Sequence, residues 1–129
     1  MLLRQPHVTT NTEDAIAVAV CAAAELLRVP LIVCLTHSGF TARTVASYRP
    51  TVPILAVTPE AATFRQLALV WGVLPALTQH HPTYEAMLPT TRDTILRLGL
   101  AQPGDRVVVT AGIPFDVAGT TNLLKIETV

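Results

Sequence analysis

Four short runs of nearly uninterrupted apolar residues recur along the chain, separated by longer segments that mix apolar and polar positions. They are LIVCL at 31–35, PILAVT at 53–58, VLPAL at 73–77 and RVVVT at 106–110. Continuous apolar runs of this length are typical of strands covered on both faces of a sheet. Pro75 lacks an N–H and therefore favours a sheet edge for the third run. The final segment, 121–129, alternates and is predicted to be a half-exposed strand.

The mixed segments carry signals for the start of helices. We predict four helices, at about 12–28, 41–48, 59–70 and 84–98. Thr10 or Asn11 can cap the first helix, because both side chains accept a hydrogen bond from a free backbone N–H. Thr58 ahead of Pro59 is a plausible start for the third. Pro89 predicts an irregularity or a first-turn position in the fourth.

The alternation of strands and helices predicts the fold class. Parallel strands joined by helical crossovers give an α/β protein with helices on both faces of the sheet. No helix separates the last two strands, so the final strand should run antiparallel to its predecessor. We therefore expect one domain over residues 1–129, a three-layer α/β/α sandwich with five strands, four of them parallel.

Composition narrows the function classes. The 129 residues are half apolar and carry no formal net charge, which argues against nucleic-acid binding. No apolar stretch is long enough to span a bilayer, and the first residues do not read as a targeting signal, so we expect no membrane partner and a cytoplasmic location. Cys21 and Cys34 are predicted to be buried free thiols.

A hydroxyl-rich turn follows the first predicted strand. The segment Thr36-His37-Ser38-Gly39-Phe40-Thr41 stands where a helix should begin, and backbone N–H groups there can bind an anion such as phosphate. Simple helix capping by Ser38 or Thr41 is the alternative interpretation. The flanking residues do not match the G-x-S-x-G pattern of a hydrolase nucleophile.

Other candidate features favour structural interpretations. His80 and His81 are adjacent, so their side chains diverge, and we expect a solvated loop without a metal site. Trp71 at a helix end is predicted to lie in the core or in an interface. Gly112 and Gly119 bound a loop, and the glycines do not spell a dinucleotide-binding motif.

Four segments resemble the C-terminal domain of pyruvate kinase, and bacterial members more closely than animal ones. They are THSGFTARTVASYRP at 36–50, PILAVTPE at 53–60, RQLALVWGV at 65–73 and GDRVVVTAGIPFDVAGTTNLLKIETV at 104–129. The resemblance implies a regulatory and assembly domain that binds a phosphorylated effector.

The resemblance also implies a set of effector residues. The phosphate-binding positions would be Thr36, His37, Ser38, Gly39 and Thr41, and a loop containing Gly112, Gly119, Thr120 and Thr121 would close over the ligand. Animal members often carry basic residues where this chain has His37 and Phe40, and an arginine where spacing places Met87. We therefore expect a weak site for a single phosphate.

The family's catalytic residues lie in a separate (β/α)8 barrel and a lid domain, which also bind magnesium and a monovalent cation. By resemblance, this domain should hold no cofactor or catalytic residue and should be inactive alone. The chain would be either such a regulatory domain or a stand-alone α/β protein that binds a small phosphorylated metabolite. The strand at 121–129 predicts a homo-oligomer formed through this strand and neighbouring helices.

Overall fold

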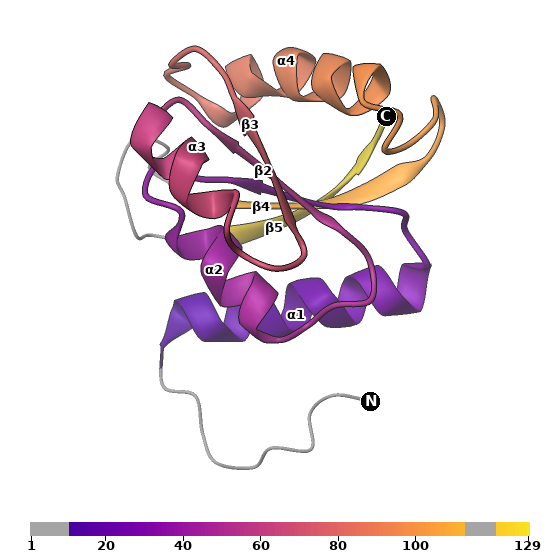
Figure 1. The fold of residues 1–129 in the computed structure, drawn as a ribbon. Helices are drawn as coiled ribbons and strands as arrows, with labels where there is room; N and C mark the ends of the chain where they lie inside the picture. The colour runs from indigo at the N-terminus through magenta and orange to yellow at the C-terminus, as the bar shows by residue number, and fades with distance from the viewer. Residues whose placement is uncertain (1–10, 113–120) are drawn as a thin grey trace.

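The computed structural model describes residues 11–112 and 121–129, which form nine elements. Helices and strands alternate until the last two strands follow each other directly (Figure 1). In chain order the elements are α1 (Thr12–Leu27), β1 (Ile32–Leu35), α2 (Phe40–Ser47), β2 (Ile54–Thr58), α3 (Ala61–Leu67), β3 (Val73–Leu77), α4 (Tyr84–Arg97), β4 (Arg106–Gly112) and β5 (Thr121–Thr128).

The five strands form one sheet in the order β3-β2-β1-β4-β5. β1 pairs in parallel with both β2 and β4, and β2 pairs in parallel with β3. β5 runs antiparallel to β4, with an irregularity in register between Ala111 and Gly112. The predicted fold class and the edge position of the proline-containing strand are both confirmed.

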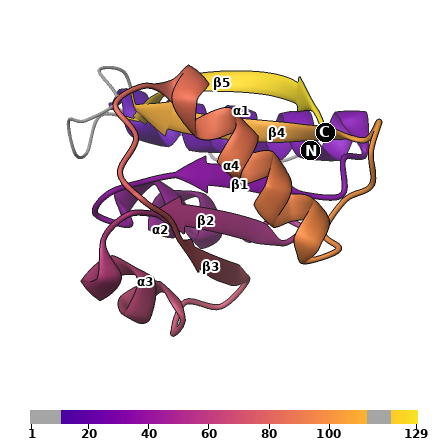
Figure 2. The same cartoon turned by 90° about the horizontal axis from the view of Figure 1, so that it is seen from above.

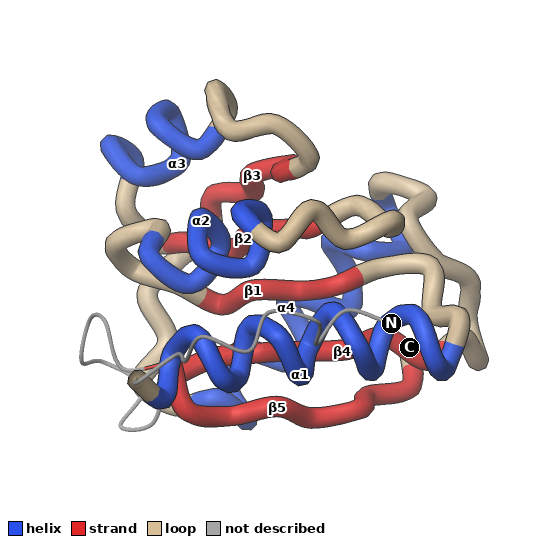
Figure 3. Tube along the Cα trace, turned by 90° about the horizontal axis from the view of Figure 1, so that it is seen from below, coloured by secondary structure: helices blue, strands red, loops and turns tan. Residues whose placement is uncertain are grey.

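The helices form two layers around the sheet. α1 packs on β4 and β5, α2 on β1 and β2, and α3 on β2 and β3. Seen from below, these three helices lie in front of the strands (Figure 3), whereas α4 crosses the opposite face alone (Figure 2). The arrangement is the predicted three-layer sandwich.

Alternate residues of the strands feed two hydrophobic clusters, one on each face. Ile32 and Cys34 of β1 point to the cluster beneath α1, α2 and α3. Val33 and Leu35 point to the cluster that includes Met87 of α4. Every residue of β1 and β2 is buried, which is why the sequence shows continuous apolar runs there.

Three details differ from the sequence predictions. α3 is shorter than predicted and has Glu60 as its N-cap. Thr58 is fully buried at the end of β2, and its hydroxyl accepts from the Glu60 N–H at 3.1 Å. Pro89 lies inside α4 beyond its first turn. Trp71 is 73% exposed, so it does not lie in the core, and its predicted alternative place in an interface stays a prediction. The Arg49 guanidinium lies 5.0 Å from its ring centroid.

The predictions for the two cysteines and for membrane-spanning segments can also be compared with the structure. Cys21 and Cys34 are buried free thiols, as predicted. Within residues 11–112 and 121–129, no helix is long and apolar enough to cross a membrane.

Candidate functional site

In the turn after β1, two backbone N–H groups donate to hydroxyl groups of the turn itself. The Gly39 N–H donates to the Thr36 hydroxyl at 2.9 Å, and the Phe40 N–H donates to the Ser38 hydroxyl at 3.3 Å. The N-cap of α2 is Gly39, which has no side chain, so neither Ser38 nor Thr41 occupies the cap position that the alternative interpretation gave them, although the Ser38 hydroxyl does accept from the first N–H of the helix. Ser38 instead lies one residue ahead of the cap, and its side chain is exposed.

Gly39 is favoured by its backbone conformation and has neighbouring side chains close to it. Its φ of +86° is in the left-handed region that favours glycine. A Cβ at this position would lie 2.7 Å from Nη1 of Arg43 and 3.2 Å from Cδ2 of Leu67. The Arg43 guanidinium donates to the Ser38 carbonyl at 3.1 Å and to the Gln66 side chain at 3.2 Å. Arg43, a residue of α2, therefore links the turn to Gln66 of α3.

The turn is joined to the far end of the chain through Thr41. Its hydroxyl and the hydroxyl of Thr121 form a buried hydrogen bond, in which either oxygen can donate. Thr121 begins β5 and pairs with Gly112, the last residue of β4. The structure thus brings Thr41, Gly112 and Thr121 to one end of the sheet. Gly119 and Thr120, the other two predicted loop residues, lie outside the described residues.

The turn lies where the order of strands reverses. The chain moves from β1 to β2 on one side, and β4 later returns to the other side of β1. β1 and β4 are adjacent parallel strands, so their carboxyl ends lie side by side at this switch point. In open α/β sheets, a switch point of this kind is the usual place for a ligand.

His37 is held through its backbone and lies near a second histidine. Its carbonyl oxygen accepts hydrogen bonds from the hydroxyls of Thr63, at 2.8 Å, and Thr58, at 3.3 Å. The centroid of its ring lies 6.0 Å from that of His80, with the planes tilted by 44°. His80 is exposed in the loop between β3 and α4, as predicted, but its proximity to the turn was missed. No local pattern could reveal it, because the contact depends on strand order.

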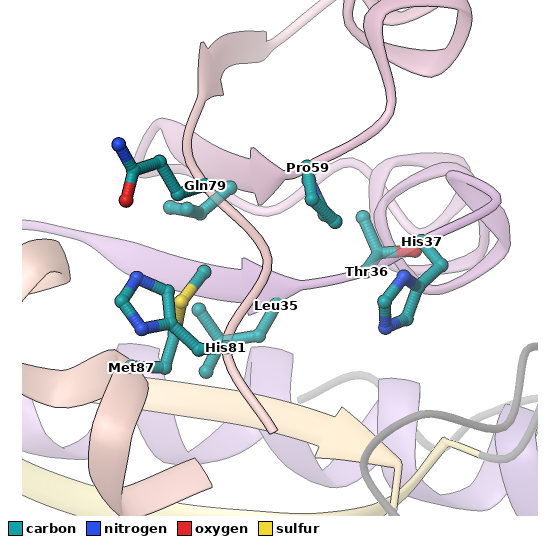
Figure 4. Close-up of a pocket in the computed structure, with 8 residues that line it drawn as sticks. Leu35, Thr36, His37, Pro59, Gln79, His81 and Met87 are labelled. Carbon is teal, nitrogen blue, oxygen red and sulfur yellow. The ribbon is translucent and has the colours of Figure 1, made fainter. Parts of the chain in front are cut away.

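A small pocket adjoins the turn at the carboxyl ends of β1 and β2 (Figure 4). Figure 4 shows His37 and Thr36 on one side of it, and His81 and Met87 on the other. Met87 is 2% exposed, and His81 Nε2 lies 3.4 Å from the Thr90 hydroxyl of α4. The pocket is lined by Leu35, Thr36, His37, Val57, Pro59, Gln79, His81 and Met87.

The chemistry available at the turn is binding by hydrogen bonds. Among the described residues, the Ser38 hydroxyl accepts from the Phe40 N–H and forms no hydrogen bond to a base that would activate it as a nucleophile. Burial raises the pKa of the Cys21 thiol to about 11, and the pKa of Cys34 rises further, so both thiols are protonated at neutral pH. No cluster of three or more metal-ligating side chains occurs in the described part of the chain.

The chain is similar to one family of known proteins. The family model described as "Pyruvate kinase, alpha/beta domain" matches residues 14–127. Over 126 residues, or 98% of this chain, it is 42% identical to a pyruvate kinase of Clostridium acetobutylicum and 43% identical to one of Staphylococcus saprophyticus. The chain spans only 27% and 22% of the lengths of these relatives.

Proposed function

Because this chain belongs to the alpha/beta domain family of pyruvate kinase, we propose that it is a regulatory domain that binds one phosphorylated effector at the 36–41 turn. The placement of this turn at the reversal of strand order, beside Gly112 and Thr121, is the observation that carries the proposal. A phosphate there would accept hydrogen bonds from the turn and the N-terminus of α2. Residues 36, 37, 38, 39 and 41 would form the contact.

The charges near the turn favour a weak site. A helix N-terminus stabilises a bound, exposed anion by about 0.3–1 kcal/mol, and a charge-assisted hydrogen bond stabilises it by about 1.5–3 kcal/mol. Micromolar affinity requires about 8 kcal/mol in total. Phe40 is exposed and neutral, and Arg43 is already bonded to Ser38 and Gln66. We expect dissociation constants on the order of millimolar for the isolated domain.

The same residues favour a monophosphate over a bisphosphate. Met87 is buried at the wall of the adjacent pocket, where it offers no charge to a second phosphate. Calorimetric titration with glucose 6-phosphate and fructose 1,6-bisphosphate should give similar affinities for both. The Ser38→Ala variant should bind both more weakly. A bisphosphate bound about a hundredfold more tightly than the monophosphate would contradict the single-phosphate site.

We propose that the domain does not catalyse phosphoryl transfer by itself. That activity, from phosphoenolpyruvate to ADP with magnesium and a monovalent cation, would belong to other parts of a full-length enzyme. In the described residues the Ser38 hydroxyl forms no hydrogen bond to a base, which supports a binding role. A coupled assay of pyruvate formation from phosphoenolpyruvate and ADP should give no turnover with this chain alone, and measurable turnover would overturn the proposal.

The proposed partner is a second copy of the chain, and the proposed location is the cytoplasm. β5 is an edge strand of eight residues, and its Ile126 is 40% exposed. An edge of this length can pair with its counterpart in a twin molecule. Light scattering should show a dimer that dissociates when Ile126 is replaced by lysine. A monomer at all concentrations would contradict this part of the proposal.

A further inference from the structure

Two side chains of α3 hold the turn that follows β1. Thr63 and Gln66 are three positions apart, so they share one face of this helix. The Thr63 hydroxyl donates to the His37 carbonyl at 2.8 Å, and the Gln66 side chain accepts from the Arg43 guanidinium at 3.2 Å. Neither α3 residue belongs to the effector residues that the family resemblance implies.

The bond from Thr63 fixes the peptide that joins His37 to Ser38. The His37 carbonyl also accepts from the Thr58 hydroxyl at 3.3 Å, and both threonines are buried. A trans peptide is planar, so its carbonyl and the following N–H point in opposite directions. The Ser38 N–H therefore points away from β2 and α3. It makes no hydrogen bond within the described part of the chain, which leaves it available to a ligand.

The next peptide of the turn is held at both of its ends. The Ser38 carbonyl accepts from the Arg43 guanidinium at 3.1 Å, and the Gly39 N–H donates to the Thr36 hydroxyl at 2.9 Å. Two consecutive carbonyl oxygens of the turn thus already accept hydrogen bonds from side chains. Their partial negative charge is directed at these donors and not at an anion bound to the turn.

Thr63 is the closer of the two donors to the His37 carbonyl. The Thr58 hydroxyl lies 0.5 Å farther away, and it also accepts from the Glu60 N–H at 3.1 Å. Without the Thr63 hydroxyl, the peptide between His37 and Ser38 would keep only this longer contact. A donor whose orientation is fixed before the ligand arrives loses less entropy on binding, so a freed peptide should bind an anion more weakly.

We propose that Thr63 is a positioning residue for the effector site: its hydroxyl holds the His37 carbonyl on the side of α3, and this orients the Ser38 N–H to donate to the bound phosphoryl group. The inference rests on the proposed effector site and adds to it a residue outside the 36–41 turn. It also makes a helix between β2 and β3 part of the binding site, although that helix does not touch the ligand.

Sulfate is a simple tetrahedral dianion and serves as the probe. It should be titrated into the whole chain at neutral pH, with chloride keeping the ionic strength constant, while the backbone amide resonances of residues 36–41 are followed. The variants are Thr63→Val, which loses the hydroxyl, and Thr63→Ser, which keeps it. Thr94→Val is the matched control, because Thr94 is also 7% exposed on a helix and its hydroxyl donates to a carbonyl, that of Thr90, at 2.9 Å. Urea unfolding would establish that each variant is folded.

Thr63→Val should raise the dissociation constant for sulfate about tenfold, the loss expected for one charge-assisted hydrogen bond. Thr63→Ser and Thr94→Val should bind sulfate like the wild type. The Ser38 amide proton should move downfield at saturation in the wild type and in Thr63→Ser, because it then donates to the anion. In Thr63→Val this movement should be lost.

The possible failures of the inference and of the effector site are distinguishable. If Thr63→Val binds sulfate like the wild type, or if Thr94→Val weakens binding equally, the inference is overturned and the effector site stands. The wild type gives a test that needs no variant: saturable shifts of the turn without movement of the Ser38 amide proton would also overturn the inference. If the wild type shows no saturable binding, the effector site and the inference both fall.

Discussion

The hydroxyls of Thr41 and Thr121, 80 residues apart in the chain, form a buried hydrogen bond. Thr41 is in the first turn of α2, and Thr121 is the first residue of β5. The bond therefore fixes the start of the final strand against the helix that begins at the proposed effector turn. Under the proposed function, a ligand bound at that turn would therefore be coupled to the position of β5.

Thr41→Val should destabilise the fold. Valine fills the same space, but it leaves the Thr121 hydroxyl buried without a partner, which costs about 1–3 kcal/mol. Urea unfolding followed by circular dichroism would measure the loss. Replacing Thr121 as well should recover part of the stability, because no polar group is then left unsatisfied.

Thr44→Val is the control for this prediction. Thr44 is on the same helix, but its hydroxyl donates to the Phe40 carbonyl at 2.8 Å in an exposed position. Its replacement should change the free energy of unfolding by less than about 0.5 kcal/mol. If Thr41→Val and Thr44→Val lowered the free energy of unfolding equally, the hydrogen bond to β5 would contribute no more to stability than an exposed one.

Gly39→Ala and Gly72→Ala form a matched pair. The two glycines have nearly the same positive φ, +86° and +84°, so alanine should strain each backbone by about 1–2 kcal/mol. At Gly39 the new Cβ would lie 2.7 Å from Nη1 of Arg43. At Gly72 no atom lies within 4 Å of the new Cβ. Gly39→Ala should therefore unfold at lower urea and bind sulfate more weakly, while Gly72→Ala should bind it normally.

Tyr84 should make stability depend on alkaline pH. Burial, and then its hydrogen bond to Glu127 at 2.7 Å, raise the pKa of its phenol well above the usual range. The folded state thus favours the neutral phenol. The resulting stability is fully present below the unfolded pKa of about 10 and is lost as the pH rises above it.

Urea midpoints at about pH 8 and pH 11 would test this behaviour. Tyr84→Phe should be less stable at pH 8 by about 1.5–3 kcal/mol, since it lacks the bond to a carboxylate. It should also lose less stability than the wild type between the two pH values. Tyr48→Phe, which alters an exposed tyrosine, should lose as much as the wild type. Identical pH profiles for wild type and Tyr84→Phe would refute the prediction.

The two cysteines should be unreactive in the folded chain. Both thiols are buried, and burial raises the pKa of Cys21 to about 11. Little thiolate is present at pH 8, so a disulfide reagent such as dithionitrobenzoate should react slowly in buffer and rapidly in urea, at both cysteines. Fast reaction in buffer would show that one thiol is accessible in the native state.

The sheet could be predicted well from the sequence because a strand that is buried on both faces needs apolar residues at every position. The runs at 31–35 and 53–58 are apolar because both faces of β1 and β2 are covered. The absence of a helix before 121–129 correctly predicted the antiparallel β5. Local signals were less reliable at helix starts, where Thr58 turned out to be fully buried in β2 and not a cap.

The site was only partly predictable for a different reason. The 36–41 turn is contiguous, so its position after a strand could be inferred from local sequence. The contacts of Thr41 with Thr121, and of His37 with His80, join residues that only the strand order brings together. The bracing of the turn by Arg43 and Gln66 depends likewise on how α2 packs beside α3.

The central claim, that the 36–41 turn binds a phosphorylated ligand, is best tested by mapping backbone amide shifts during titration with glucose 6-phosphate. We predict saturable shifts at a dissociation constant on the order of millimolar. They should be centred on residues 36–41 and extend to Thr121, and Gly39→Ala should weaken them. Absence of saturable shifts, or shifts centred elsewhere on the sheet, would contradict the account.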